Sequence, residues 1–195
     1  MRYNNTNNLT DYSQRIDDPA IAKYIKNNNQ WSIIFSIILA FVAVVGFQIY
    51  GETSSEMNNP EAFYIGLGIG GMFLLIAFFQ IAGRKKSTTW DGTVVEKNIR
   101  KKRRHDKYQD MWENYLLYQV TIKADNGKKH NITAEDDDTK YNYFKIGDRV
   151  RHHKGLNTYE KQDKSSDTII FCNACATLNN IEEDYCFRCK CPLLK

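Results

Sequence analysis

The five cysteines of this 195-residue chain lie close together near its C-terminus, and four of them form two CxxC pairs. Cys172 and Cys175 make the first pair, and Cys186 and Cys189 make the second after ten intervening residues. A CxxC pair folded as a tight knuckle offers two thiolates from one side. Two knuckles complete the tetrahedral four-sulfur arrangement that Zn²⁺ prefers in closed structural sites. The spacing therefore predicts one structural zinc ion bound by these four cysteines.

The sequence supports other roles for the cysteines less well. A rubredoxin-type iron site uses the same ligands and stays open. Disulfides need an oxidising compartment, and a thioredoxin-like site needs one CxxC at a helix start within an α/β domain, which the sequence does not show. The fifth cysteine, Cys191, is either a bystander or a replacement for Cys189 as a ligand. The cysteine-rich segment is too short to bury a useful hydrophobic core. Metal binding would therefore supply its folding energy, on the order of 10 kcal/mol.

No other set of residues suggests catalysis. The sequence contains no HExxH motif, no phosphate-binding loop and no suggestion of a Ser-His-Asp or Cys-His arrangement, so we predict that the protein is not an enzyme. The acidic run 135–138 lacks a cation-binding loop pattern, and we expect Asp138 or a neighbour to cap a short helix at 139–144. His152 and His153 would point to opposite faces of a strand, and we expect both at the surface.

Two apolar runs, 31–50 and 63–82, precede these residues and contain no Asp, Glu, Lys, Arg or His. As helices of about 20 residues they would be about 30 Å long, which matches the hydrocarbon core of a bilayer. The remaining chain is too small to bury two such helices in a soluble fold. A cleaved signal peptide does not fit either, because a long polar segment comes first. We therefore predict a two-helix transmembrane hairpin.

The charges around these runs predict the topology. Lys and Arg occur before the first run and directly after the second, whereas the loop 51–62 contains neither. The positive-inside rule places both termini in the cytoplasm and the loop outside. The predicted location is the cell inner (cytoplasmic) membrane, with a multi-pass chain. The cysteines then lie in a reducing compartment, which agrees with a metal site.

The second apolar run contains a GxxxG motif at Gly66 and Gly70. Small residues at this spacing let helix backbones approach closely, either within the hairpin, which we favour, or across a homodimer. No polar or ionisable residue lies in the middle of either run, as a transport path would need. The hairpin is therefore expected to be an anchor and not a channel.

Short strand-like segments dominate the middle of the chain, at 92–97, 115–124, 129–134 and 168–171. Asn126-Gly127 between two of them predicts a hairpin with a type I′ turn, which needs positive φ at both central residues. Short strands joined by tight turns predict a small mostly-β domain, an OB/SH3-like barrel.

The densest basic run, 97–107, is the candidate contact surface of this domain. It contains the consecutive residues Arg100, Lys101, Lys102, Arg103 and Arg104. The favoured interpretation is a solvated loop between strands. Contact with anionic lipid headgroups and binding of nucleic acid are the alternatives.

The C-terminal segment resembles the short zinc ribbons of many bacterial proteins, of the form CPxCGxxN…CxxCGxPL. The stretches CNACATLN and CFRCKCPLL match the ligands, Asn179 and the closing Pro-Leu. The family has glycine where this chain has Ala176 and Lys190, so the resemblance implies some strain there. The Cys-x3-Asn-x6-Cys spacing is also similar to Ran-binding-protein fingers, some of which bind RNA with arginines and a Trp; Arg188 is present, but the tail has no Trp.

The middle domain resembles the soluble OB-like domain of NfeD-type membrane proteins at Gly147, Asp148 and Val150, together with the preceding membrane hairpin. The expected fold is thus a two-helix transmembrane hairpin, a small β-domain and a zinc ribbon. The expected ranges are a polar cytoplasmic tail at 1–30, the hairpin at 31–82, the β-domain at 87–166 and the ribbon at 167–195.

Three functions are compatible with this organisation. The first is a membrane-anchored interaction or scaffolding module without catalysis, whose partners are the bilayer and a cytoplasmic protein. The second is a membrane-tethered nucleic-acid binder that uses the basic run and the ribbon. The third and weakest is a thiol redox sensor that uses Cys191.

Overall fold

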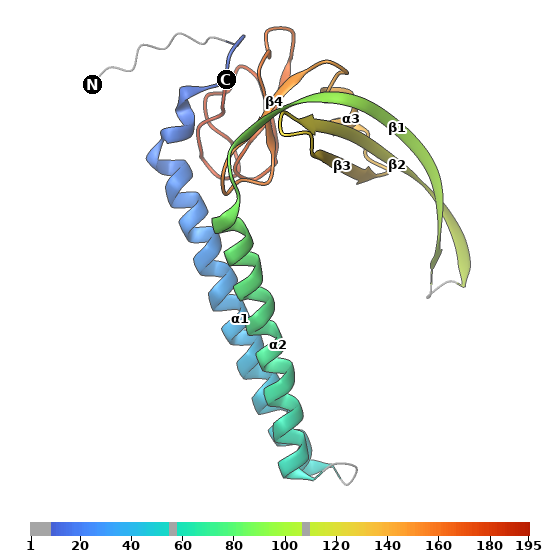
Figure 1. Cartoon of the computed structure of the whole chain (residues 1–195). Coiled ribbons are helices and arrows are strands. Elements are labelled where there is room, and N and C mark those ends of the chain that lie inside the picture. The colour runs from blue at the N-terminus through green and yellow to red at the C-terminus, as the bar shows by residue number, and fades with distance from the viewer. Residues whose placement is uncertain (1–8, 55–57, 107–109) are drawn as a thin grey trace. The chain divides into compact units, whose positions relative to one another are not determined.

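The structure is a computed structural model that describes residues 9–54, 58–106 and 110–195. The chain forms two compact units (Figure 1). The helical unit comprises residues 18–87 with 154–156, and the β-unit contains the other described residues. The elements follow the predicted order: two apolar helices, then an antiparallel mostly-β part that ends in the four cysteines of the CxxC pairs.

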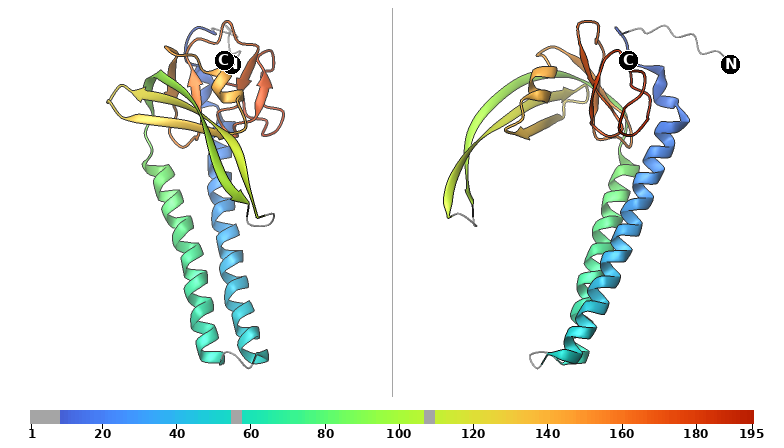
Figure 2. Two further views of the ribbon diagram at one scale, coloured as in Figure 1. Left: turned by 90° about the vertical axis from the view of Figure 1, so that its right-hand side faces the viewer. Right: turned by 180° about the vertical axis from the view of Figure 1, so that it is seen from behind.

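The helical unit consists of α1 (Pro19–Thr53) and α2 (Asn59–Lys86), which run side by side (Figure 2). Asp18 caps α1 by accepting a hydrogen bond from the N–H of Ala20, and Pro19 occupies the first turn. Only 6% of the most apolar stretch of α1 and 22% of that of α2 is buried, unlike the core helix of a soluble protein. Both helices are long and apolar enough to cross a membrane.

Gly66 and Gly70 allow α2 to approach α1 closely. A Cβ atom at Gly66 would lie 3.1 Å from the carbonyl oxygen of Ala43, and one at Gly70 would lie 3.1 Å from that of Ala40. A larger side chain at either position would push the helices apart. The GxxxG motif therefore packs within the hairpin, and a homodimer through the same glycines stays a prediction.

The β-unit is built on a five-stranded antiparallel sheet in the order β3-β2-β1-β4-β5. The strands are β1 (Trp90–Asp106), β2 (Met111–Ala124), β3 (Lys129–Glu135), β4 (Arg149–His152) and β5 (Tyr159–Lys161). The end strands β3 and β5 are not paired with each other among the described residues, so the closed OB/SH3-like barrel stays a prediction.

The hydrophobic core of the β-unit lies between this sheet, the short helix α3 (Thr139–Tyr143) and the strand β6 (Ile169–Phe171). Val120 and Ile122, two residues apart on β2, are both buried because alternate side chains of a strand share one face. The other buried members are Val94, Tyr143, Phe144, Val150 and Phe171.

The hairpin between β2 and β3 forms as predicted, but its turn type differs. Gly127 has a φ of 85°, whereas Asn126 is not among the residues with positive φ. The N–H of Gly127 donates to the carbonyl of Ala124, and the N–H of Ala124 donates to that of Lys128. This is a type I turn followed by a left-handed glycine, a three-residue loop, so the predicted type I′ turn is wrong.

The basic run is not the loop that the sequence favoured. All of its described residues, to Asp106, belong to β1. They pair with β2 from Lys97–Val120 to Asp106–Met111 without a register shift. Apolar residues occur in this part of β1 only at 94, 95 and 99 and do not alternate regularly with the basic ones. The strand was therefore not predicted to extend this far.

A segment that precedes α1 is part of the β-unit. The carbonyl of Leu9 accepts a hydrogen bond from the N–H of Lys164 at 2.7 Å, and the N–H of Ser13 donates to Oε1 of Glu160 at 2.7 Å. Arg15 forms an ion pair with Asp184 at 3.2 Å. Residues 9–17 are thus docked on the β-unit and on its cysteine-rich end.

Under this segment lies a buried ionic cluster that the sequence did not predict. Glu160 accepts hydrogen bonds from Lys164 Nζ at 2.9 Å and meets His153 Nε2 at 2.6 Å. All three residues are at most 4% exposed. The expectation that both histidines lie at the surface is therefore wrong for His153, because its neighbour on β5 is a buried carboxylate.

Candidate metal centre

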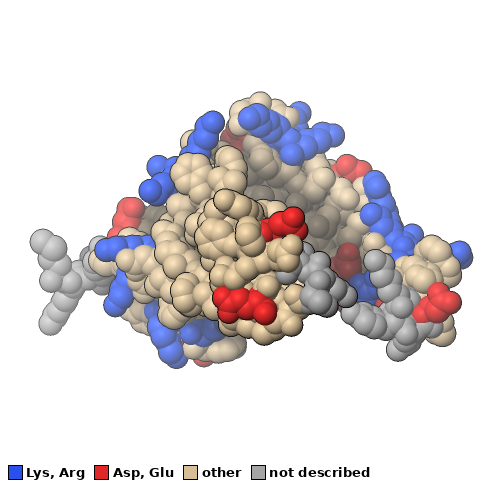
Figure 3. Space-filling model, turned by 90° about the horizontal axis from the view of Figure 1, so that it is seen from below, with Lys and Arg blue, Asp and Glu red and all other residues tan. Residues whose placement is uncertain are grey.

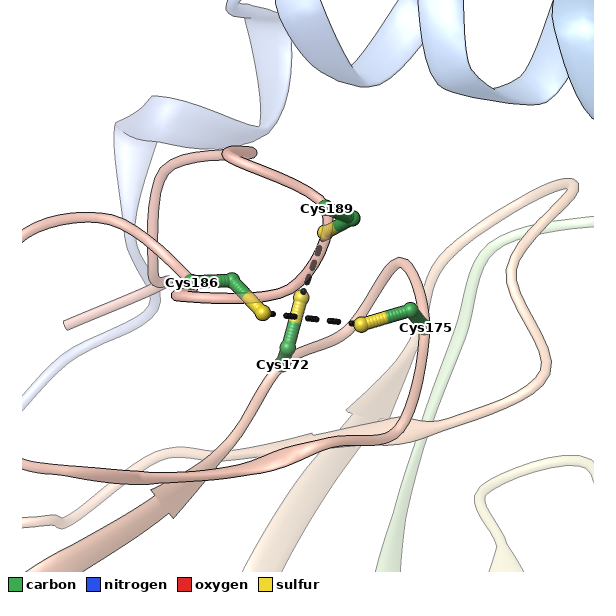
Figure 4. A group of neighbouring side chains, drawn as sticks. All are labelled: Cys172, Cys175, Cys186 and Cys189. Carbon is green, nitrogen blue, oxygen red and sulfur yellow. Dashed lines mark hydrogen bonds between the residues drawn. The ribbon is translucent and has the colours of Figure 1, made fainter.

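The first CxxC pair forms a tight knuckle directly after β6. The N–H of Ala176 donates to the carbonyl of Cys172 at 2.8 Å, and the N–H of Cys172 donates to that of Thr177 at 2.9 Å. These two bonds fold the chain back on itself. As a result, the side chains of Cys172 and Cys175 point to the same side (Figure 4).

The second pair repeats this geometry. The N–H of Lys190 donates to the carbonyl of Cys186 at 2.9 Å, and the N–H of Cys186 donates to that of Cys191 at 2.8 Å. Ala176 and Lys190, the residues directly after the knuckles, have φ values of 60° and 59°. These are the positions where the resembling ribbons have glycine, and both are in the left-handed region that favours it.

The sulfur atoms of the four cysteines lie within 4.8 Å of one another. Two distances run between the knuckles, with Cys172 Sγ 3.5 Å from Cys189 Sγ and Cys175 Sγ 3.5 Å from Cys186 Sγ. A tetrahedron with zinc–sulfur bonds of about 2.3 Å has edges of about 3.8 Å. The cluster is therefore close to the size and composition that a thiolate-bound metal needs, and these residues could hold a metal ion (Figure 4).

The electrostatics of the cluster also call for a cation. Burial raises the pKa of Cys172 to about 12, although N–H groups of Cys175 and Ala174 point at its sulfur and act in the opposite direction. For Cys186 burial also raises the pKa, but hydrogen bonds outweigh it, the largest from the Cys189 N–H, and the value falls to about 7. Four thiolates in such a site require positive charge nearby, which a bound metal ion would supply.

Asn179 connects the two knuckles. It lies on β7 (Leu178–Asn180), which pairs with β6, and is 5% exposed. Its Nδ2 donates to the carbonyl of Thr177 at 2.7 Å, and its Oδ1 accepts from the N–H of Phe187 at 3.1 Å. One side chain thus fixes the position of one half of the site relative to the other.

Cys191 contributes its backbone to this centre. Its carbonyl closes the second knuckle, and its side chain is 2% exposed. The ligand cluster found among the described residues contains Cys189 and not Cys191. The geometry therefore favours Cys189 as the fourth ligand. Leu193 and Leu194, which follow the closing Pro192, are buried and pack the end of the ribbon.

The other candidate residues lie apart from this centre. Arg100, Lys101, Lys102, Arg103 and Arg104 are exposed on β1. In the acidic run, Asp137 accepts hydrogen bonds from the hydroxyl and the N–H of Thr139 at the start of α3, and the hydroxyl bond first, then the N–H bond, lowers the pKa of Asp137. A neighbour of Asp138 thus makes the predicted contact at the helix start, where Asp138 is the N-cap residue without a capping bond.

Comparison with known proteins gives no match: no protein-family model, no curated protein and no solved structure matches the chain.

Proposed function

We propose that the protein is a membrane-anchored interaction module whose C-terminal zinc ribbon is held together by one structural Zn²⁺. The four-cysteine cluster carries the proposal. Four protein ligands leave no open coordination position, which is typical of structural and not of catalytic zinc sites. When bound, zinc supplies the charge that the buried thiolates need and much of the folding energy of the ribbon.

Metal analysis of the purified full-length chain tests the identity of the ion. We expect about one zinc per chain in wild type and almost none after Cys172→Ser. A preparation that contains iron in place of zinc would contradict the choice of metal, and one without any metal would contradict the site.

The membrane part of the proposal uses α1 and α2 as spans in a bacterial inner membrane, with both termini cytoplasmic. Its support is the low burial of both helices and the distribution of Lys and Arg around them. A thiol reagent that cannot cross membranes should label the cysteines only after the cells are permeabilised and the metal is removed. Labelling that requires metal removal but not permeabilisation would contradict this topology.

The surface of the ribbon offers a place for a protein partner. Phe187 and Tyr185 are 63% and 59% exposed, and Leu178 is partly exposed beside them. Phe187, Leu178 and Ile169 border a hollow of about 480 Å³. Exposed aromatic and apolar side chains around a hollow are typical of protein interfaces, and we propose that a cytoplasmic protein docks here. The proposal includes no catalytic step.

Affinity capture from solubilised membranes tests this surface. A partner should be retained by wild type and by Trp112→Ala, an exposed aromatic elsewhere in the β-unit, and lost with Phe187→Ala. The zinc content of all three proteins must be equal. A partner that Phe187→Ala retains, or the absence of any partner, would contradict the proposal.

Nucleic-acid binding is the second candidate. Arg100, Lys101, Lys102 and Arg103 are exposed and make no ion pair within the described part of the chain. Binding of DNA or RNA by phosphate contacts would be strong at low salt and fall steeply as salt rises, and its absence at low salt would exclude it. A redox role for Cys191 has less support because its side chain is buried; an oxidant response that Cys191→Ser leaves unchanged would exclude it.

A further inference from the structure

The β1–β2 hairpin extends well beyond the sheet that supports its base. β4 pairs with β1 only from Trp90 to Thr93, and β3 pairs with β2 only from Leu117 to Lys123. Residues 101–105 and 111–116 therefore form a two-stranded structure. Together with Ile99 and Arg100 at its base we call it the distal ribbon, and Figure 2 shows it curving away from the other strands. Such a ribbon is marginally stable in water on its own, so contact of one of its exposed faces with another surface would stabilise it.

The two faces of the distal ribbon differ in their acidic and exposed apolar side chains, although both contain unpaired Lys and Arg. Paired residues share a face, so Trp112 lies with His105, Asn114 with Arg103 and Leu116 with Lys101. This Trp112 face contains no Asp or Glu of either strand, and the carboxylate of Asp110 in the adjoining turn lies 3.1 Å from Nε2 of His105. The opposite face includes Glu113, which forms an ion pair with Arg104 at 3.0 Å. Figure 3 shows Lys and Arg side chains gathered over the hairpin, at the right of that view.

The Trp112 face combines exposed apolar side chains with cations that are not neutralised. Trp112 is 67% exposed, and Ile99 and Leu116 on the same face are 52% and 38% exposed. Lys101 and Arg103 lie between them, are exposed, and make no ion pair with any described residue. Apolar groups beside uncompensated cations suit a surface that is anionic outside and apolar underneath.

We propose that the Trp112 face of the distal ribbon docks on the surface of a bilayer that contains anionic lipid. Trp112 would sit at headgroup level, where amphipathic rings are favoured, while Lys101 and Arg103 contact lipid phosphates. Aliphatic Ile99 and Leu116 gain by leaving water at the acyl boundary, whereas single-stranded nucleic acid would use stacking aromatic groups. The lipid surface therefore accounts for more of the face than nucleic acid does.

The chain ties the β-unit to the proposed membrane anchor by a short connection. Only three residues separate the end of α2 at Lys86 from the start of β1 at Trp90, so these two residues lie at most about 14 Å apart. The inference rests on the proposed function, because a membrane lies close to the start of β1 only if α2 spans it. It adds a second, reversible contact of the β-unit with the same membrane.

Fluorescence of the full-length chain in vesicles tests the docking. Its three tryptophans are Trp31, Trp90 and Trp112, so subtracting the spectrum of Trp112→Phe from wild type isolates Trp112, and subtracting that of Trp31→Phe isolates the helix. The vesicles contain phosphatidylcholine alone or mixed with phosphatidylglycerol, each with and without acyl chains brominated as a quencher. Trp112 should be quenched and blue-shifted only in the anionic vesicles, and high salt should reverse this because it shortens the Debye length to about 3 Å at 1 M.

Two double variants supply a matched comparison on one strand. Lys101→Gln with Arg103→Gln removes two charges from the Trp112 face and should weaken docking on the order of thirtyfold. Arg100→Gln with Lys102→Gln removes the same charge from the opposite face and should have a much smaller effect. Equal effects of both pairs would overturn the proposed face.

The remaining outcomes separate this inference from the anchoring. Quenching of Trp31 without any lipid-dependent change of Trp112 would overturn the docking and leave the anchor intact. Absence of quenching at Trp31 would contradict the anchor itself. Trp112 that responds to a single-stranded RNA at low salt, but not to anionic lipid, would overturn the lipid proposal in favour of nucleic acid.

Discussion

Replacing Ala176 or Lys190 by glycine should strengthen metal binding, although glycine usually weakens folded structure. Both residues lie directly after a knuckle, with φ values of 60° and 59°. In this region the Cβ atom of an L-residue crowds the following carbonyl oxygen, at a cost of about 1–2 kcal/mol. Glycine lacks the Cβ atom, so each replacement removes that cost from the folded ribbon.

The expected gain follows from two opposing terms. Glycine loses about 0.5–1 kcal/mol more conformational entropy on folding than alanine does, which leaves a net gain of about 0.5–1 kcal/mol per position. Both replacements together should contribute about 1–2 kcal/mol. If the ribbon folds as it binds zinc, as we propose, this corresponds to zinc affinity about five- to thirtyfold higher.

Competition for zinc between the full-length chain in detergent micelles and a chromophoric chelator measures this affinity. Ala174→Gly is the matched control, because Ala174 lies inside the first knuckle and is not among the residues with positive φ. Its affinity should fall about two- to fivefold, which is the ordinary effect of glycine. If Ala176→Gly and Lys190→Gly lower the affinity as the control does, the knuckle geometry described here is wrong.

Three further predictions concern the polar contacts of the β-unit. Glu160→Gln leaves the ammonium of Lys164, 2.9 Å away and buried, without its charge partner, and should lower the free energy of unfolding in denaturant by about 3–5 kcal/mol; adding Lys164→Met should recover part of the loss. Asn179→Ala removes one hydrogen bond to Thr177, beside the first knuckle, and one to Phe187, in the second, and should cost about 1–3 kcal/mol, seen as faster zinc release to a chelator. The pKa of Asp91 is lowered, chiefly because Arg151 donates a hydrogen bond to its carboxylate. The stabilisation from this contact is therefore present at neutral pH and is lost as the pH falls below the ordinary value of 3.8 and through the lowered pKa. Asp91→Asn should flatten the acid-unfolding curve in that pH range.

Each of these predictions has a contradicting result. The first is contradicted if Glu160→Gln has the same free energy of unfolding as wild type. The second is contradicted if Asn179→Ala releases zinc at the wild-type rate, and the third if Asp91→Asn leaves the acid-unfolding curve unaltered.

The four-cysteine cluster and the apolar helices could be predicted because their signals are local. The ligands of a knuckle are three residues apart, so the spacing of Cys172 and Cys175 already indicates which side chains converge. A span needs only length and the absence of charge. The left-handed backbone at Ala176 was also indicated, because the zinc ribbons that this segment resembles have glycine at that position.

The features that the sequence did not predict depend on contacts between distant segments. Leu9 and Ser13 dock through backbone groups, which any residue type could provide. His153 is buried because a strand close in space presents Glu160 to it. Asn126-Gly127 is compatible with more than one hairpin loop, and the length of the loop, set by the pairing of Ala124 with Lys128, selects the type I turn.

X-ray absorption at the zinc edge of the purified full-length protein tests the central claim most directly. The account predicts four sulfur neighbours at about 2.3 Å, a spectrum that Cys191→Ser leaves unchanged, and the loss of one sulfur neighbour in Cys189→Ser. Nitrogen or oxygen neighbours in the wild-type protein, or a sulfur neighbour lost with Cys191→Ser, would contradict it.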